Sequence, residues 1–424
     1  MYKAPRGTSD ILSQDQRYWR YVEGKAANVC QFYGYRRIDT PIFEEAGLFI
    51  RGVGAGTDIV EKEMYSFHDR GGDLMTLRAE GTAPVCRAYL EHGMYNLPQP
   101  VKLYYIAPIF RYERPQAGRY RQHQQFGCEA IGDADPALDA EVIDLAWKFL
   151  GDVGLRDPSL ILNSIGCPVC RPRYLEALTD YYKDKADQLC PDCRKRLERN
   201  PLRLLDCKLE TCSIVAGFAP KSIDYLCPEC RQHFESLRHY LEIMNLPYLL
   251  DHRLVRGLDY YTRTVFEIQP EAEGAQSALC GGGRYDNLIE ELGGKPTPAV
   301  GFGSGLDRII LNIKRQEISV PPDPNPDVYI AYVGSEAKAE AVKLAGTLRR
   351  AGIMSFLAFG DRSLKAQMRQ ANTVKAAYAI VIGEEEVTSG TVVLRDLAKR
   401  AQESIERSRL LEYLKSSART VELS

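Results

Sequence analysis

The chain has 424 residues, a net charge of −2, 26% charged residues and 45% hydrophobic residues. This length is sufficient for a large core and at least one further domain, and the balanced charge gives no global signature of nucleic-acid binding. No apolar run approaches the roughly 20 residues of a membrane-spanning helix. The N-terminal segment lacks the apolar stretch of a signal peptide and is too acidic and aromatic for a transit peptide, so we expect a cytoplasmic protein without a membrane partner.

Two segments near the N-terminus combine polar and apolar residues in distinctive ways. YGYRRIDTPIFEE at 33–45 is apolar enough to bury a surface. TLRAEGTAPVCRAYL at 76–90 places Arg78, Glu80 and Thr82 just before an amphipathic helical pattern. The start of a helix explains Glu80 and Thr82, because such residues cap helices, but it does not explain Arg78.

Residues 103–132 have the pattern of two β-strands joined by a turn. LYYIAPIFRYE is rich in strand-forming residues, RPQAGRY contains the proline and glycine of a turn, and RQHQQFGCEAIG forms the returning strand. Alternation places Arg111 and Glu113 on one face of the first strand, and Gln125, Gly127 and Glu129 on one face of the second. A solvated hairpin with cross-strand ion pairs fits this pattern, but the planar fork of arginine favours a phosphate site.

Eight of the twelve cysteines lie within 166–246, a charged and mainly helical segment that resembles an insertion. CPVC at 167–170 and CPDC at 190–193 have the spacing of a four-cysteine zinc site, and CKLETC at 207–212 with CPEC at 227–230 gives a second, looser set. A single site with leftover thiols and metal-free cysteines are the alternatives, and the sequence does not say which pairs meet. We expect structural Zn²⁺ to be bound by Cys167, Cys170, Cys190, Cys193, Cys207, Cys212, Cys227 and Cys230.

Two later segments carry candidate ligand-binding residues. LVRGLDYYTRTVFEI at 254–268 predicts a β-strand, because β-branched and aromatic residues dominate it. Arg256 and Asp259 do not fit a strand, and they indicate either a structural ion pair or a site for an anion. PAVGFGSGLDRIIL at 298–311 has glycines that let a backbone approach a ligand, followed by a helical pattern near Arg308. Tight strand–helix packing explains those glycines equally well.

The segment VPPDPNPD at 320–327 is a linker, because four prolines in six positions sustain neither a helix nor an inner strand. Beyond it, strand and helix patterns alternate from DVYIAYV to a closing helix. This alternation predicts a compact α/β domain at 327–424, separate from a larger domain at 1–325.

Together these segments resemble the histidyl-tRNA synthetase family of class II aminoacyl-tRNA synthetases. YGYRRIDTPIFEE is similar to the first class motif, FRYERPQAGRYRQHQQFGCEAIG to the second and GFGSGLDR to the third, while LVRGLDYYTRTVFE and ALCGGGRYDNLI resemble the two signatures of the histidine enzymes. The resemblance implies an α+β fold. Its parts would be an antiparallel β-sheet core flanked by helices at 1–325, the helical Cys-rich insertion at 166–246, and an α/β anticodon-binding domain at 327–424.

The resemblance also implies an activity, namely ATP-dependent activation of L-histidine to histidyl-adenylate and transfer to the 3′ end of tRNA(His) by a homodimer that uses Mg²⁺. Arg111 and Arg256 would be catalytic, and Asp259 would orient Arg256 or a neighbour. ATP would be bound by Arg111, Glu113 and Arg308. The histidine pocket would consist of Glu80, Thr82, Gln125, Glu129, Tyr260, Tyr261 and Tyr285.

A non-catalytic alternative has the same core, namely the synthetase-like regulatory subunit of ATP phosphoribosyltransferase in histidine biosynthesis. Such proteins lack the anticodon-binding domain and lose parts of the motifs. This chain has residues 327–424 and keeps Arg111, Glu129, Arg256 and Arg308. We therefore expect the ligase rather than the regulatory subunit.

Overall fold

The computed structural model describes residues 2–54, 57–113, 120–270, 278–360 and 362–417. The chain divides into two compact units, Met1–Pro321 and Pro322–Ser424. The boundary lies in the proline-rich segment, which forms neither helix nor strand. In the described part of the chain, no helix is long and apolar enough to cross a bilayer.

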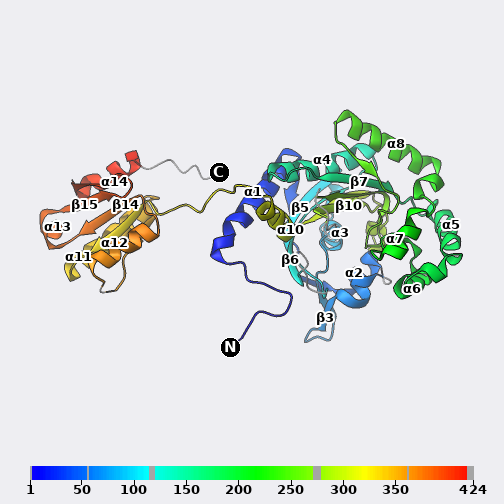
Figure 1. The fold of residues 1–424 in the computed structure, drawn as a ribbon, viewed down its shortest axis with the longest axis horizontal. Coiled ribbons are helices and arrows are strands. Elements are labelled where there is room, and N and C mark those ends of the chain that lie inside the picture. Colours follow the sequence, from blue (N-terminus) through cyan, green and yellow to red (C-terminus); the bar gives the residue numbers. More distant parts are fainter. Residues whose placement is uncertain (1, 55–56, 114–119, 271–277, 361, 418–424) are drawn as a thin grey trace. The chain divides into compact units, whose positions relative to one another are not determined.

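The first unit is built on an eight-stranded, mainly antiparallel sheet (Figure 1). In spatial order the strands are β1 (Arg36–Arg37), β5 (Val101–Phe110), β6 (Gln122–Ile131), β11 (Ala299–Gly305), β10 (Cys280–Arg284), β9 (Thr262–Gln269), β7 (Ser159–Ser164) and β8 (Leu249–Leu250). The outer pairs β1–β5 and β7–β8 are parallel, and the pairs between them are antiparallel. The predicted antiparallel core is therefore confirmed. The turn of the β5–β6 hairpin, 114–119, lies outside the described residues.

Four helices cover one face of this sheet with an apolar core. They are α1 (Gln16–Phe32), α4 (Pro136–Asp152), α8 (Pro228–Ile243) and α10 (Leu306–Arg315). Phe126 of β6 points into this core, where its ring packs edge-on against Phe149 and Phe302. Because side chains alternate along a strand, Gln125 and Glu129 point to the opposite face, as the sequence predicts.

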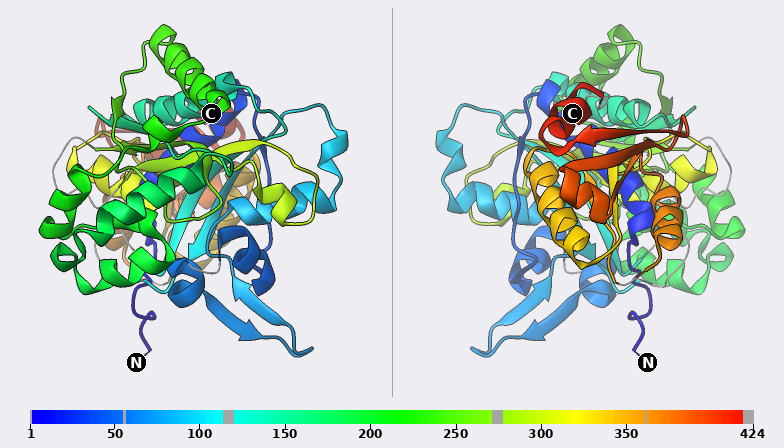
Figure 2. Two further views of the ribbon diagram at one scale, coloured as in Figure 1. Left: turned by 90° about the vertical axis from the view of Figure 1, so that its right-hand side faces the viewer. Right: turned by 90° about the vertical axis from the view of Figure 1, so that its left-hand side faces the viewer.

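The opposite face carries helices α3 (Thr82–Glu91) and α9 (Leu288–Glu291), with α2 (Ala46–Val53) beside them. A small sheet of β2 (Phe43–Glu45), β4 (Leu74–Leu77) and β3 (Tyr65–His68) projects from this side (Figure 2). Arg78 follows β4, is 4% exposed, and donates to the carbonyl oxygens of Pro108 at 2.7 Å and Thr40 at 2.8 Å. Arg78 thus joins the first motif to β5. This structural role accounts for Arg78, which the start of a helix does not explain.

The Cys-rich insertion leaves the sheet after β7 and returns at β8. Its helices are α5 (Arg171–Lys183), α6 (Pro191–Arg199), α7 (Glu210–Gly217) and α8, with the short 3₁₀ turn η5 (Pro201–Leu204) after α6. Ion pairs of 3.4–3.5 Å join Arg196 and Arg203 of this segment to Asp58. The insertion therefore docks onto the chain that follows α2.

The predicted strand at 254–268 begins only at Thr262, and residues 254–261 form bends and turns. The prediction was wrong for these residues because buried aromatic side chains occur in pocket walls as well as in strands. Tyr260 and Tyr261 are 4% and 6% exposed, and both line a pocket.

The second unit is the expected α/β domain. Its sheet has the order β13 (Ser355–Leu357), β12 (Val328–Tyr332), β14 (Tyr378–Ile382), β15 (Thr391–Asp396) and β16 (Ala401–Glu406). The helices are α11 (Ser335–Arg350), α12 (Leu364–Thr373), α13 (Glu384–Ser389) and α14 (Arg407–Ser417). The sequence analysis did not predict β16, because this edge strand is exposed and lacks apolar alternation.

Candidate active site

A pocket opens on the face of the large sheet that points away from α1 and α4. Its walls come from the β5–β6 hairpin, the start of α3, the turns at 254–261, and strands β10 and β11. Most of the residues predicted from the sequence line it, namely Glu80, Thr82, Arg111, Glu113, Gln125, Arg256, Tyr260, Tyr261, Tyr285 and Arg308. The fold therefore brings together residues that are up to 228 positions apart, from Glu80 to Arg308.

Glu129 lies beneath the floor of this pocket, fully buried. Its Oε1 accepts a hydrogen bond from the hydroxyl of Thr82 at 2.7 Å, and its Oε2 accepts one from Tyr285 at 2.5 Å. Burial raises the pKa of Glu129 to about 8, although both hydrogen bonds favour the carboxylate. Gly301 makes room for this group, because a Cβ there would lie 1.9 Å from Oε2. Close side-chain approach thus explains this glycine of the GFGSG motif.

Glu80 caps the N-terminus of α3. Its Oε2 accepts from the backbone N–H of Thr82 at 2.6 Å, and its Oε1 accepts from that of Ala83 at 2.8 Å. The helix-start interpretation of Glu80 is therefore correct. Each carboxylate oxygen has a second lone pair, so the same group can cap the helix and accept a hydrogen bond from a ligand in the pocket.

Arg256 lines the same pocket as Glu80. Its Nη1 pairs with Glu267 Oε2 at 2.6 Å, and its guanidinium lies over Gly281, where a Cβ would be 2.2 Å from Nη2. Glu267 thus orients Arg256. Asp259 was expected to orient Arg256 or a neighbour; for Arg256 this was wrong, and Asp259 instead accepts a hydrogen bond from Asn200 of the insertion at 3.0 Å.

Two further arginines flank the mouth of the pocket. Arg111 Nε donates to the carbonyl oxygen of Ala79 at 2.7 Å, and Arg308 Nη1 donates to that of Ala278 at 3.1 Å. His123, which the sequence analysis did not select, lies between them. Burial, followed by the charges of Arg111 and Arg308, lowers its pKa to about 3, so its ring is neutral at pH 7. Two guanidinium groups thus stand at this end of the pocket, together with the carboxyl groups of Glu113 and Asp307.

Two polar atoms on the pocket side of the sheet have no hydrogen-bond partner among the described residues, namely Gln125 Oε1 and the hydroxyl of Tyr105. Tyr105 pairs with Gly127 across the hairpin, and its ring occupies the space that side chains at Gly81 and Gly127 would need. Gln125 lines the pocket, so its Oε1 is available to a polar ligand, since buried polar atoms normally have a partner. The sequence analysis missed Tyr105, although alternation along β5 places it on the pocket face.

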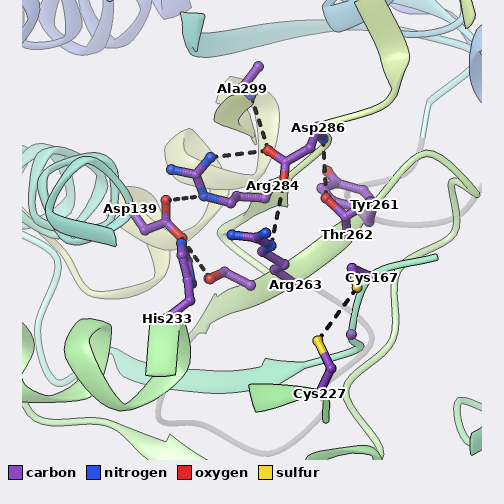
Figure 3. Close-up of polar contacts among 12 residues, drawn as sticks. Asp139, Cys167, Cys227, His233, Tyr261, Thr262, Arg263, Arg284, Asp286 and Ala299 are labelled. Carbon is purple, nitrogen blue, oxygen red and sulfur yellow. Dashed lines mark hydrogen bonds and ion pairs between the residues drawn. The ribbon is translucent and has the colours of Figure 1, made fainter. Parts of the chain in front are cut away.

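A buried polar network supports the strands behind the pocket (Figure 3). Arg284 of β10 is fully buried and pairs with Asp139 at 2.7 Å and Asp286 at 3.1 Å. Asp139 also accepts from Thr264 at 2.6 Å and lies 3.4 Å from the ring of His233 on α8. Burial raises the pKa of Asp139 to about 6 and lowers that of His233 to about 3. The network thus joins helices α4 and α8 to strands β9 and β10.

The eight paired cysteines form two groups of four, with the sulfur atoms in each group within 4.8 Å of one another. The members are Cys167, Cys170, Cys227 and Cys230 in the first group, and Cys190, Cys193, Cys207 and Cys212 in the second. Cys167 Sγ lies 3.8 Å from Cys170 Sγ and 3.9 Å from Cys227 Sγ. Two sulfurs on one tetrahedral zinc with bonds of about 2.3 Å are roughly 3.8 Å apart, so the first group has the right size.

The grouping differs from the order of the pairs in the sequence. The spacing suggested the first pair with the second and the third with the fourth, while leaving the pairing open; in the structure the first pair meets the fourth and the second meets the third. Ser222 of the short turn η6 (Ser222–Tyr225) donates to the carbonyl oxygen of Ser164 at the end of β7 at 2.7 Å. The residues just before Cys227 therefore lie against the residues just before Cys167, and this brings the first and fourth pairs together.

The antiparallel sheet, the arginine-flanked pocket and the second α/β unit define a class II aminoacyl-tRNA synthetase. The family model for histidyl-tRNA synthetase matches residues 7–169 and 222–309, and the model for an anticodon binding domain matches 327–417. The chain belongs to the histidyl-tRNA synthetase family. The unmatched residues 170–221 lie in the insertion and include most of the paired cysteines.

Individual relatives cover nearly the whole chain. The histidine–tRNA ligase of Dehalococcoides mccartyi is 58% identical over 415 residues, which are 98% of this chain and 99% of that protein. The ligase of Pelotomaculum thermopropionicum is 50% identical over 411 residues, 97% of each chain. The crystal structure of apo S. aureus histidyl-tRNA synthetase matches with a TM-score of 0.82 at 39% identity, covering 98% of this chain and 100% of that one.

Proposed function

We propose that this protein activates L-histidine with ATP to form histidyl-adenylate and then transfers the histidyl group to the 3′ end of tRNA(His). The observation that carries the proposal is the pocket itself, in which a buried carboxylate faces tyrosines and a cluster of arginines flanks the mouth. Relatives at 58% and 50% identity are histidine–tRNA ligases, which favours this activity over the regulatory-subunit alternative.

Histidine would be recognised at the floor. Glu129 would accept a hydrogen bond from the imidazole, assisted by Tyr261, while Gln125 and Tyr285 complete the same end. Glu80 and Thr82 would bind the α-amino group. A side chain without hydrogen-bonding groups would leave Gln125 Oε1 without a partner and the remaining lone pairs of Glu129 unused, and this penalty is the basis of discrimination.

ATP would lie toward the arginines, with its α-phosphate on Arg111 and its adenine and γ-phosphate near Arg308. Arg256 would stand beside both reacting anions, the histidine carboxylate and the α-phosphate, and offset the charge that spreads over phosphorus during in-line attack. Glu113, which lies 4.0 Å from Arg111, would help to hold the Mg²⁺ that accompanies ATP, and the ion would offset charge on the phosphates.

The second step requires a path for the 3′ end of tRNA. A hollow that shares Arg111, Arg256 and Arg308 with the pocket continues toward Arg203 and Lys208 of the insertion. We infer that the insertion contacts the acceptor arm along this hollow. In the second unit, exposed basic residues are candidates for contact with the anticodon arm, namely Arg362, Lys365, Arg369 and Lys375.

We propose that the working form is a cytoplasmic homodimer built on the first motif. Ile42, Phe43, Phe67 and Leu74 of the small sheet and its flank are 44–54% exposed, an apolar group suited to burial against a second copy. The small sheet projects away from the large one, which leaves this surface accessible (Figure 2).

The proposed activity is tested by histidine-dependent exchange of labelled pyrophosphate into ATP, followed by charging of tRNA(His) transcripts. We expect exchange that requires histidine and Mg²⁺, and charging of tRNA(His) in preference to other tRNAs. Folded protein that shows no exchange with Mg²⁺ supplied would contradict the ligase and favour the regulatory subunit.

We also propose that each cysteine group binds a structural Zn²⁺. Four thiolates close the coordination shell of zinc and leave no position for a substrate, so the role is to hold the insertion together. Backbone N–H groups of Cys190 and Cys193 donate to Cys212 Sγ and Cys190 Sγ at 3.2 and 3.4 Å, which stabilises thiolates in the second group.

Removal of zinc is expected to lower both the thermal stability of the first unit and the rate of tRNA charging. Metal content measured by mass spectrometry should be close to two zinc ions per chain. The zinc chelator 4-(2-pyridylazo)resorcinol should lower the melting temperature. Adding Mg²⁺ alone should not reverse this change, whereas adding Zn²⁺ should restore the melting temperature. An unchanged melting temperature and charging rate after complete metal removal would contradict the structural role.

A further inference from the structure

The first cysteine group is linked to the histidine pocket by one side chain, that of Arg171. This residue follows Cys170 and begins α5, and its backbone N–H donates to the carbonyl oxygen of Cys167 at 2.9 Å. Its Nη2 donates to the carbonyl oxygen of Tyr261 at 2.5 Å and to that of Gly166 at 3.1 Å. One guanidinium therefore joins the metal-binding turn to the backbone of a pocket tyrosine.

The same turn fixes the point at which the pocket segment enters β9. Arg263, two residues after Tyr261, has φ +50°, an uncommon conformation for a residue other than glycine. Its N–H donates to Gly166 and its carbonyl accepts from Ile165, both at 2.8 Å. Such strain persists only where the surroundings impose it. The turn at 165–171 thus imposes the backbone course of the pocket segment, close to Cys167 and Cys227 (Figure 3).

The cysteine sulfurs also shape the turn itself. Gly166 has φ +70°, and a Cβ at this position would lie 2.7 Å from Cys170 Sγ, so the backbone lies directly against the thiol. A Zn²⁺ ion with four thiolates carries a net charge of about −2, which attracts the guanidinium and holds it in place.

We infer that Arg171 is a positioning residue for the histidine pocket, through which metal occupancy of the first cysteine group sets the affinity for histidine. The inference rests on the proposed function, because it concerns the same pocket. Metal bound at Cys167 and Cys170 fixes Arg171, and Arg171 fixes the carbonyl of Tyr261 and so the tyrosine side chains that face histidine. Thermodynamic linkage is reciprocal: if bound metal raises the affinity for histidine by some factor, bound histidine raises the affinity for the metal by the same factor.

The variant Arg171→Met tests this link, because it keeps an apolar stem of similar length and removes every donor. We expect the KM for histidine in pyrophosphate exchange, measured without tRNA, to rise about tenfold or more while the KM for ATP changes less than twofold. The matched control is Arg173→Met, an exposed arginine on the same helix, for which both KM values should stay within twofold of the parent. A general loss of structure would change both KM values together, so the separation of the two is the diagnostic readout.

A second measurement does not depend on activity, and its main comparison is made on the parent. Zn²⁺ release to 4-(2-pyridylazo)resorcinol is followed from the parent with and without saturating histidine. We expect histidine to slow release of at least one metal ion severalfold in the parent, and not in Arg171→Met. Release that is insensitive to histidine in the parent, or an unchanged KM for histidine in folded Arg171→Met, would overturn the inference. Absence of exchange in the parent would instead count against the proposed function.

Discussion

Replacement of Arg256 by histidine is expected to lower the rate of histidine-dependent pyrophosphate exchange by roughly 10²–10³-fold, the usual effect of losing one preorganised group that stabilises transition-state charge. Arg256 is fixed by Glu267 at 2.6 Å and stands on the pocket wall, so its charge needs no reorganisation during the reaction. A neutral imidazole is shorter and cannot offer two parallel donors. Because charge spreads over phosphorus only during attack, kcat should fall more than the KM values rise.

The control for this variant is Arg238→His. Arg238 lies on α8, outside the pocket, and donates to the hydroxyl of Tyr248. Its exchange rate should match that of the parent. Zinc content and the melting temperature are measured on all three proteins. Arg256→His protein that is folded, retains its metal and exchanges at the parental rate would remove Arg256 from the proposed chemistry.

Local sequence patterns predicted the parts of the site that lie within single elements. The alternation along 103–132 placed Gln125 and Glu129 on one face, and the hairpin has that arrangement because one face of β6 packs against α4 and α10. The start of α3 was also predictable, because the capping role of Glu80 depends only on residues two and three positions later. Such features follow from the period of a strand or helix, which the sequence displays directly.

Contacts between distant segments were not predictable in the same way. The grouping of the cysteine pairs depends on the contact of Ser222 with the end of β7, and no spacing within 167–230 encodes that contact. Glu267 pairs with Arg256 because the chain turns back between them, whereas the nearer carboxylate, Asp259, contacts the insertion. Residues 254–261 were predicted as a strand from their composition, but buried tyrosines occur in pocket walls as well as in strands, so composition alone does not distinguish the two.

The buried carboxyl of Glu129 leads to the second large expected effect, on both activity and the pH dependence of stability. Glu129→Gln keeps the shape but leaves an acceptor oxygen for only one of Thr82 and Tyr285, and it cannot take on the negative charge that would strengthen a hydrogen bond to histidine. Hydrogen bonds to charged groups contribute about 1.5–3 kcal/mol, so kcat/KM for histidine should fall roughly 10–100-fold while the KM for ATP stays near its parental value. Initial rates of exchange across a histidine series measure this effect.

Thermal unfolding of the same variant provides an independent test. Burial raises the pKa of Glu129 in the folded state to about 8, above its ordinary value of 4.5, so between these pH values the folded state holds more protons than the unfolded state. Its contribution to stability is therefore complete below pH 4.5 and is lost as the pH rises through 8. Glutamine does not titrate, so the melting temperature of Glu129→Gln minus that of the parent should increase from pH 5 to pH 9.

The surface variant Glu91→Gln separates this effect from a general loss of charge, since Glu91 pairs with Arg87 on the exposed side of α3 and is 57% exposed. Its melting temperature should follow that of the parent at every pH. A difference between Glu129→Gln and the parent that is constant from pH 5 to pH 9 would show that Glu129 is ionised in the folded protein over that range. Recognition of histidine would then depend on a carboxylate that is already charged before the substrate binds.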